Sequence, residues 1–164
     1  MLVYRNRQFR ISKKHPLYGY CDTVTALCCN LENAVRFRQR QLLTVVKKAP
    51  ADRSENENFI LAEVMDAIPV MSKHYQVPSE NRYAYGYDFY NSLLKVTGNP
   101  DYHAEGLPRQ SAQQSIKKCV RDLNSYFASM KAYKKDKSAF TGVPKIPGYH
   151  RKGGHVTAII TNQD

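Results

Sequence analysis

Residues 17–48 decide the fold, and they read LYGYCDTVTALCCNLENAVRFRQRQLLTVVKK. Apolar residues such as Val24, Leu31 and Leu42 recur mostly at steps of three and four, which is the spacing of one face of an α-helix. Arginines and lysines occupy the second half of the stretch, and Pro50 follows it as a helix terminator. The pattern predicts one long helix over residues 17–48.

Further helical patterns follow toward the C-terminus. Residues 59–68 predict a shorter helix with Asn58 as its N-cap and a break near Pro69. An aromatic-dense stretch, residues 83–90, leads into another apolar segment that stops before Gly98. Pro108 then opens a second long helix, predicted from residue 109 to about 133, with a regular apolar stripe.

Short β-forming segments flank the helical region. In residues 7–11 basic or polar side chains alternate with Phe9 and Ile11, and residues 156–161 read VTAIIT. These patterns predict a strand at each end of the chain and therefore an α+β fold. Because a two-stranded ribbon is marginally stable alone, we expect a fragment of a longer protein or a chain that completes its sheet elsewhere.

The composition favours one cytoplasmic domain. The chain has 164 residues, a length that suits a single core. No run of about eighteen apolar residues is present that would cross a bilayer, so no membrane partner is expected. The first residues have no apolar segment typical of a secretion signal.

The net charge of +11 is unevenly distributed along the chain. Residues 1–48 carry ten basic and two acidic side chains, and residues 107–155 carry eleven and two, whereas residues 49–106 carry four and nine. If the two basic flanks meet in space, they form a surface suited to a polyanion. Ordinary solvation of helix faces is the alternative, and we favour nucleic acid.

The sequence has no recognisable catalytic or metal-binding constellation. None of the four cysteines lies in a C-x-x-C pair, and Cys21, Cys28 and Cys29 fall in the long helical pattern, where a reduced cysteine acts as a small apolar residue. Glu63 and Asp66, three apart, are typical of a solvated helix face. No glycine-rich phosphate loop occurs. We therefore expect no catalytic residue, no metal and no cofactor in this chain.

Residues able to contact nucleic acid are plentiful. Arg109 and Gln113 stand one helical turn apart on the polar side of the second long helix, and such side chains bond guanine and adenine edges in a major groove. A polar helix face without a partner is the alternative. Four tyrosines within residues 83–90 exceed what a small core needs, so some of their rings are candidates for contact with bases.

Several segments of the chain resemble a known family. They are residues 107–114 (LPRQSAQQ), 126–127 (YF), 140–149 (FTGVPKIPGY), 160–163 (ITNQ) and the first long helix at 31–39. The chain is similar to the N-terminal half of TnpB, a family of insertion-sequence-encoded, RNA-guided DNA endonucleases related to type V CRISPR effectors. The chain departs from the family pattern at Glu32, where an aromatic residue is common, and at Val143, where a basic one is common.

The resemblance implies an architecture. It implies an oligonucleotide-binding-like wedge of β-strands at both ends, with an inserted α-helical recognition lobe. Residues 1–12 would be a wedge strand, 13–139 the lobe, and 140–164 a basic loop and wedge strand, truncated before a RuvC-like nuclease. The family's Mg and Zn sites would lie only in the missing C-terminal half, so the chain alone is expected to be inactive as an enzyme.

The resemblance also implies partners and contact residues. The partners would be guide RNA, double-stranded DNA with a transposon-adjacent motif, and the remaining nuclease portion of the same protein. Contacts to the DNA motif are expected from Arg109, Gln113, Tyr85 and Tyr87. Contacts to RNA or DNA backbone are expected from Arg36, Arg38, Lys117, Lys145, Tyr149, Arg151 and Lys152.

These features predict the nucleic-acid-recognition portion of a TnpB-like endonuclease, cytoplasmic and nucleoid-associated. One alternative is a nuclease-free, RNA-guided DNA-binding transcriptional regulator. Another is a basic structural protein that touches nucleic acid only non-specifically, which would make the motif resemblance accidental.

Overall fold

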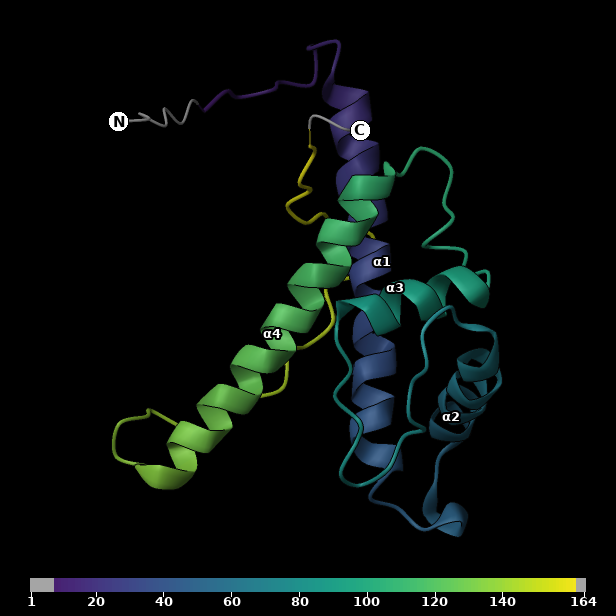
Figure 1. The fold of residues 1–164 in the computed structure, drawn as a ribbon. Helices are drawn as coiled ribbons and strands as arrows, with labels where there is room; N and C mark the ends of the chain where they lie inside the picture. The colour runs from purple at the N-terminus through teal and green to yellow at the C-terminus, as the bar shows by residue number, and fades with distance from the viewer. Residues whose placement is uncertain (1–7, 162–164) are drawn as a thin grey trace, which may run out of the picture.

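The computed structural model describes residues 8–161, and these residues form an all-helical fold (Figure 1). Their α-helices are α1 (Tyr18–Val45), α2 (Glu55–Ala67), α3 (Tyr87–Val96) and α4 (Arg109–Lys135). Two short 3-10 turns, η1 (Pro50–Asp52) and η2 (Ile68–Val70), follow α1 and α2. Within this described range, no helix is long and apolar enough to cross a membrane.

Helix α1 is the centre of the fold, as its apolar pattern predicts. It packs against α2 on one side and α4 on the other. Its buried residues Leu31, Val35 and Leu42 join Ile60 of α2 and Ile116 of α4 in one hydrophobic core. The predicted first long helix is thus confirmed, and it ends at Val45, close to the expected position.

Helix α2 begins earlier than the sequence pattern predicts. Its N-cap is Ser54, and not Asn58: the Ser54 hydroxyl accepts a hydrogen bond from the Glu57 amide, and the Glu57 carboxylate accepts one from the Ser54 amide. This reciprocal arrangement satisfies two backbone donors that a helix start leaves without partners. The expected interruption at Pro69 is present as η2.

The predicted wedge strands are wrong for the part of the chain that the structure describes. Residues 8–12 and 156–161 contain no strand, and an isolated bridge between Ser79 and Arg82 is the only β-pairing among the described residues. Residues 1–7, which hold most of the first predicted strand, lie outside the described range. A β-forming segment needs a neighbouring strand, and residues 156–161 lie against helices instead. The α+β class is therefore corrected to all-α.

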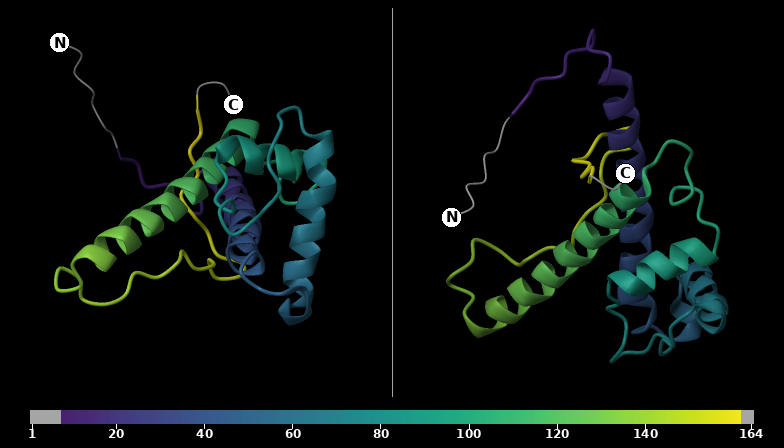
Figure 2. Two further views of the ribbon diagram at one scale, coloured as in Figure 1. Left: turned by 60° about the horizontal axis from the view of Figure 1, so that its bottom comes forward. Right: turned by 45° about the horizontal axis from the view of Figure 1, so that its top comes forward.

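The C-terminal part of the chain runs back along α1. We call residues 147–156 the C-terminal strap. Arg40 donates to the Pro147 carbonyl, Asn33 bonds both backbone groups of His150, and the Val156 amide donates to the Thr25 carbonyl. The strap thus runs along α1 in the opposite direction to the helix, and both views in Figure 2 show it beside α1. These contacts join residues more than 100 positions apart.

Helix α4 divides into two halves. All its buried residues lie between Ser111 and Leu123 and face α1 and α3, whereas residues 124–135 include none. Figures 1 and 2 show this second half leaving the helical body, with residues 136–146 returning beside it. We call residues 124–135 the α4 arm.

Candidate nucleic-acid interface

The first half of α4 presents a polar row over two tyrosines. Arg109, Gln113 and Lys117 follow one another at steps of four, with Arg109 and Lys117 exposed and Gln113 half-buried. The Arg109 guanidinium lies 5.9 Å from the centre of the Tyr102 ring, and the Lys117 ammonium lies 5.0 Å from the centre of the Tyr87 ring. These five residues form what we call the α4 head surface, which brings together three of the four residues expected to contact the DNA motif.

Tyr85, the fourth of these residues, is a core residue. It is 6% exposed, stacks on Phe89 with ring centres 3.8 Å apart, and donates its hydroxyl to the Gln76 carbonyl at 2.7 Å. Burial raises the pKa of Tyr85 to about 12. Alternation within residues 83–90 does not reveal which rings face inward, because the helix begins only at Tyr87.

Arg36, expected to contact nucleic-acid backbone, lies in a buried network of charges. Its guanidinium donates to the Gly148 carbonyl and to Asp122, and it lies 3.6 Å from the fully buried carboxylate of Glu32. Glu32 also accepts hydrogen bonds from Lys118 at 2.9 Å and 3.0 Å. Arg36 therefore links α1, α4 and the C-terminal strap.

His150 completes the network from the strap side. Its Nε2 lies 2.7 Å from the Glu32 carboxylate. The buried Glu32 carboxylate thus faces cationic or titratable groups from its own helix, from α4 and from the strap. We call Glu32, Arg36, Lys118, Asp122 and His150 the Glu32 network. A sequence pattern does not reveal it, because its members lie up to 118 positions apart.

Arg38 is also engaged inside the protein. It is 6% exposed and forms two hydrogen bonds with the Glu63 carboxylate of α2 and one with the Ala34 carbonyl. The pairing explains why an arginine lies in the interior, since a buried cation requires a partner. The expected backbone contacts of Arg36 and Arg38 stay predictions, and they would compete with these intramolecular partners.

The four C-terminal residues expected to contact backbone are all exposed: Lys145, Tyr149, Arg151 and Lys152. The Tyr149 ring lies 5.3 Å from the guanidinium of Arg40. Arg151 closes a tight turn by accepting a hydrogen bond from the Gly154 amide at 2.9 Å, and Gly153 in that turn has φ +68°. A turn of this kind favours glycine, and it leaves the Arg151 and Lys152 side chains on the surface.

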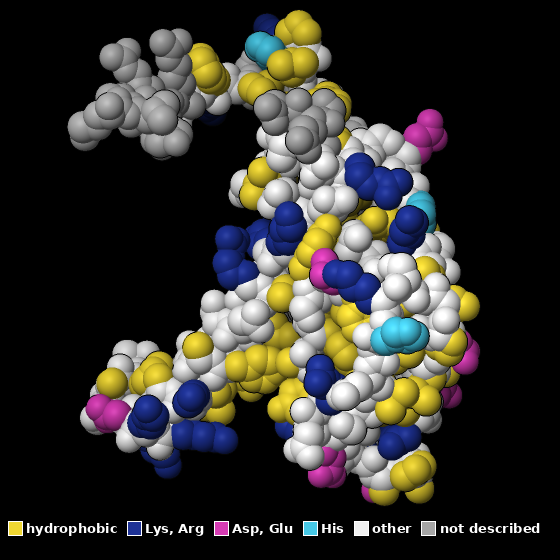
Figure 3. All heavy atoms as spheres, in the orientation of Figure 1, with side chains coloured by type: hydrophobic (Ala, Val, Ile, Leu, Met, Phe, Trp, Pro, Cys, Tyr) yellow, Lys and Arg dark blue, Asp and Glu magenta, His cyan; other side chains and the backbone are white. Residues whose placement is uncertain are grey.

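The two basic flanks of the sequence meet in space. Helix α1 comes from the first flank and α4 and the strap come from the second, and both pack on α1. Figure 3 shows Lys and Arg side chains at the far end of α4 and at the left edge of the molecule, and others across the centre and right of this face, where acidic side chains also lie. Some of the basic side chains pair with acids of the protein itself: Arg36 and Lys118 with Glu32, and Arg38 with Glu63.

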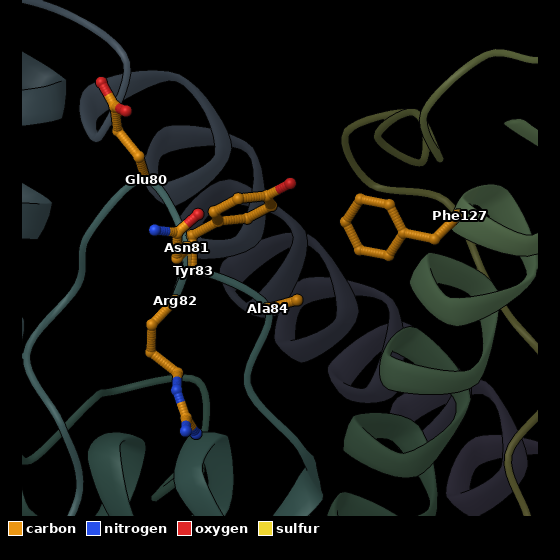
Figure 4. A pocket seen from close by; sticks show the side chains of 6 residues that line it. All are labelled: Glu80, Asn81, Arg82, Tyr83, Ala84 and Phe127. Carbon is orange, nitrogen blue, oxygen red and sulfur yellow. The ribbon is translucent and has the colours of Figure 1, made fainter. Parts of the chain in front are cut away.

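Sequence reasoning missed one feature, a hollow beside the α4 arm. It has a volume of about 540 Å³ and is lined by residues 80–84 and Phe127. Figure 4 shows the Tyr83 and Phe127 rings turned toward each other across it. The lysines Lys131, Lys134 and Lys135 on the arm are exposed and were not among the expected contacts. The signal for them was present, since the predicted apolar stripe continues beyond Leu123 with aromatic residues beside lysines.

The cysteines behave as apolar residues. Cys28, Cys29 and Cys119 are buried and no disulfide links them. Burial raises the pKa of the Cys28 thiol, and it raises the pKa of the Cys119 thiol to about 12. Within residues 8–161, no group of three or more His, Cys, Asp or Glu side chains is placed to hold a metal ion.

Comparison with protein-family models, curated proteins and solved structures finds no match for the chain.

Proposed function

We propose that this chain is the nucleic-acid-recognition part of a TnpB-like, transposon-encoded RNA-guided DNA endonuclease. It would bind guide RNA and the transposon-adjacent motif of double-stranded DNA. Cleavage would belong to a nuclease portion outside this sequence, together with any Mg or Zn that it requires. A location on the nucleoid within the cytoplasm follows from these partners.

The α4 head surface is the observation that carries the proposal. Arg109 and Gln113 occupy successive turns of one helix face, with Arg109 exposed and Gln113 half-buried. Side chains of these types pair bidentately with guanine and adenine in the major groove. Lys117, one turn further, is positioned to contact a phosphate. The rings of Tyr87 and Tyr102 lie beneath the two cations and hold them over that face.

The composition of α4 supports the same function. Between residues 109 and 135 it has seven Lys or Arg residues and a single acid, Asp122, which pairs with Arg36. Such an excess along one element is the electrostatic footprint of a polyanion site. The motif resemblance at residues 107–114, which begins this helix, points to the same surface.

Selection from randomised duplex DNA tests the proposal. The chain is loaded with RNA transcribed from the DNA that flanks its gene, and its preferred motif is compared with those of Arg109→Ala and Gln113→Ala. Each variant is expected to lose discrimination at one base, by about 1–3 kcal/mol for a lost bidentate contact. Arg121→Ala is the control, because an exposed arginine that contacts only phosphate should weaken all sequences equally.

Unchanged motif preference in both Arg109→Ala and Gln113→Ala would show that these two residues do not read the DNA motif. Metal-dependent DNA cleavage by the purified chain would reject the division between recognition and nuclease portions. Absence of any RNA or DNA binding at low salt would reject the proposed function as a whole, since the affinity of a basic surface for a polyanion is greatest there.

A further inference from the structure

The α4 arm has an aromatic face that the helical body does not cover. Phe127, Met130 and Tyr133 recur at steps of three, with Tyr126 next to Phe127, yet all four are only half-buried. In a helix packed on a core, a stripe with this spacing is buried. Leu123 is the last buried residue of α4, and Figure 2 shows the following part of the helix diverging from the other helices. An apolar face of this kind in an otherwise well-packed molecule indicates an interaction surface.

Two aromatic side chains of the arm contact aromatic rings outside it. Phe127 lies 6.1 Å from Tyr83 between ring centres, and Tyr133 lies 5.7 Å from Phe140 on the returning loop. The hollow at Tyr83 and Phe127 has a volume of about 540 Å³, within the roughly 300–1,000 Å³ of small-ligand sites. Figure 4 shows that the Arg82 side chain leaves this hollow on the side away from Phe127. Aromatic rings are therefore present at both ends of the arm.

The same arm is strongly basic. Lys131, Lys134 and Lys135 of the arm and Lys137 just beyond it are exposed, and among residues 8–161 none of the four forms an ion pair. The nearby acid Asp136 accepts hydrogen bonds from the amide and hydroxyl of Ser138, which lower its pKa. In Figure 3 the dark blue side chains gather at the end of the arm, and hydrophobic ones lie between the arm and the body.

Rings and lysines together specify the occupant. An apolar peptide would explain the aromatic stripe and leave the lysines without a role. A nucleic-acid duplex would explain the lysines, but its bases are stacked on one another and do not reach protein rings. A single strand meets both requirements, because its bases stack on aromatic side chains while its phosphates lie near cations.

We propose that the α4 arm, with the hollow at Tyr83 and Phe127, binds single-stranded nucleic acid by base stacking. The inference rests on the proposed function and deepens it: the head of α4 reads duplex DNA, and the arm holds an unpaired strand. Both the unpaired part of a guide RNA and a displaced DNA strand present the required chemistry.

Fluorescence anisotropy with labelled 12-nucleotide probes tests the inference, using oligo-U RNA, oligo-dT DNA and a duplex of equal length. The double variant Phe127→Leu with Tyr133→Leu keeps apolar side chains and removes the ring faces. It should bind both single strands at least about five-fold more weakly, the loss expected for one stacked base, and bind the duplex as before. Tyr20→Leu, at a remote exposed ring on α1, is the matched control and should change nothing.

The charge component has its own variant. Lys131→Gln with Lys134→Gln should reduce the slope of log affinity against log salt by about 1.4 for single strands, at about 0.7 per lost phosphate contact. Lys73→Gln with Lys95→Gln, on the acidic side of the chain, is the matched control and should leave the slope unchanged. Tighter binding of RNA than of DNA would identify the guide RNA as the strand that the arm binds. Equal binding of the two would indicate that the arm also binds the displaced DNA strand.

Unchanged single-strand affinity in the ring variant would overturn the inference, as would an equal loss on the duplex. A dimer in sedimentation that the ring variant converts to monomer would make the arm an interface between copies and would also overturn it. The proposed function survives either result if Arg109→Ala still relaxes the DNA motif. It fails separately if the unmodified chain binds none of the three probes.

Discussion

At the residue scale, Glu32 organises the molecule. Its carboxylate is fully buried and is bonded by Lys118 of α4 and faced by His150 of the strap. A buried acid is costly unless it is paired, so the acid and its cations depend on one another. Glu32 thus forms a charged junction between α1, α4 and the strap.

Replacing Glu32 by glutamine should destabilise the fold strongly. The substitution keeps the shape and leaves Arg36 and Lys118 without their buried counter-charge, which typically costs about 3–5 kcal/mol. Denaturant unfolding followed by circular dichroism measures the loss. Asp88→Asn is the control, because Asp88 pairs with Lys73 on the exposed surface, and there stability should not change. Equal stability of the two variants would contradict the role assigned to Glu32.

Glu57 gives stability a defined pH dependence. Hydrogen bonds from the Thr44 hydroxyl, the Lys48 ammonium and the Ser54 amide lower the pKa of its carboxyl from 4.5 to about 2. Because the folded pKa lies below the unfolded one, this contribution is present above about pH 4.5 and is lost as the pH falls toward 2. Unfolding measured at several pH values should show a smaller loss on acidification for Glu57→Gln than for the unmodified chain.

The matched control for that experiment is Glu55→Gln, at an exposed acid in the same first turn of α2. It should retain the full acid sensitivity of the unmodified chain. If Glu57→Gln also retained all of it, the capping box at Ser54 would have no part in the pH dependence.

At the scale of elements, the C-terminal strap is held by side chains of α1 and not by a β-ladder. The Asn33 amide donates to the His150 carbonyl at 3.2 Å and accepts from the His150 amide at 2.8 Å. One side chain therefore substitutes for a neighbouring strand at this point.

Asn33→Ala should release the strap locally. It leaves both backbone groups of His150 without partners, and hydrogen exchange at the His150 amide should accelerate at least about ten-fold, in keeping with the 1–3 kcal/mol cost of such a loss. Helix content should stay the same. Asn124→Ala, at an exposed position on the arm, should leave exchange at His150 unchanged. Preserved protection in Asn33→Ala would mean that Asn33 does not hold the strap.

The helices were predictable because their apolar periodicity is local. The spacing in α1 predicts buried apolar residues such as Val24, Leu31 and Leu42, whereas the buried polar residues of the same helix, such as Glu32 and Gln39, lie outside the apolar pattern. Pro108 and Gly98 mark real boundaries. The terminal strands were not predictable, since residues such as Ile159 and Ile160 have β-propensity, yet a strand depends on a partner that no local pattern contains. The helical pattern correctly predicts that Arg109 and Lys117 lie on the surface. It does not predict the burial of Arg36, Arg38 and Tyr85, which depends on contacts distant in sequence.

At the scale of the whole molecule, α4 and the C-terminal strap pack on one side of α1, and α2 from the acidic middle of the chain packs on another. The first flank supplies α1, and the second supplies α4 and the strap, while α2 and α3 belong to the acidic stretch. Under the proposed function, this separation would provide one polyanion-binding side, with the α4 head surface and the α4 arm at its two ends.

Lysine footprinting tests this central claim most directly. The chain is acetylated briefly with and without RNA, and modification at each lysine is measured by mass spectrometry. RNA should protect Lys117, Lys131, Lys134, Lys145 and Lys152, because these exposed cations lie on the basic flanks. Lys73 and Lys95 of the acidic stretch should react equally in both samples. Uniform protection of all lysines, or protection confined to Lys73 and Lys95, would contradict the account.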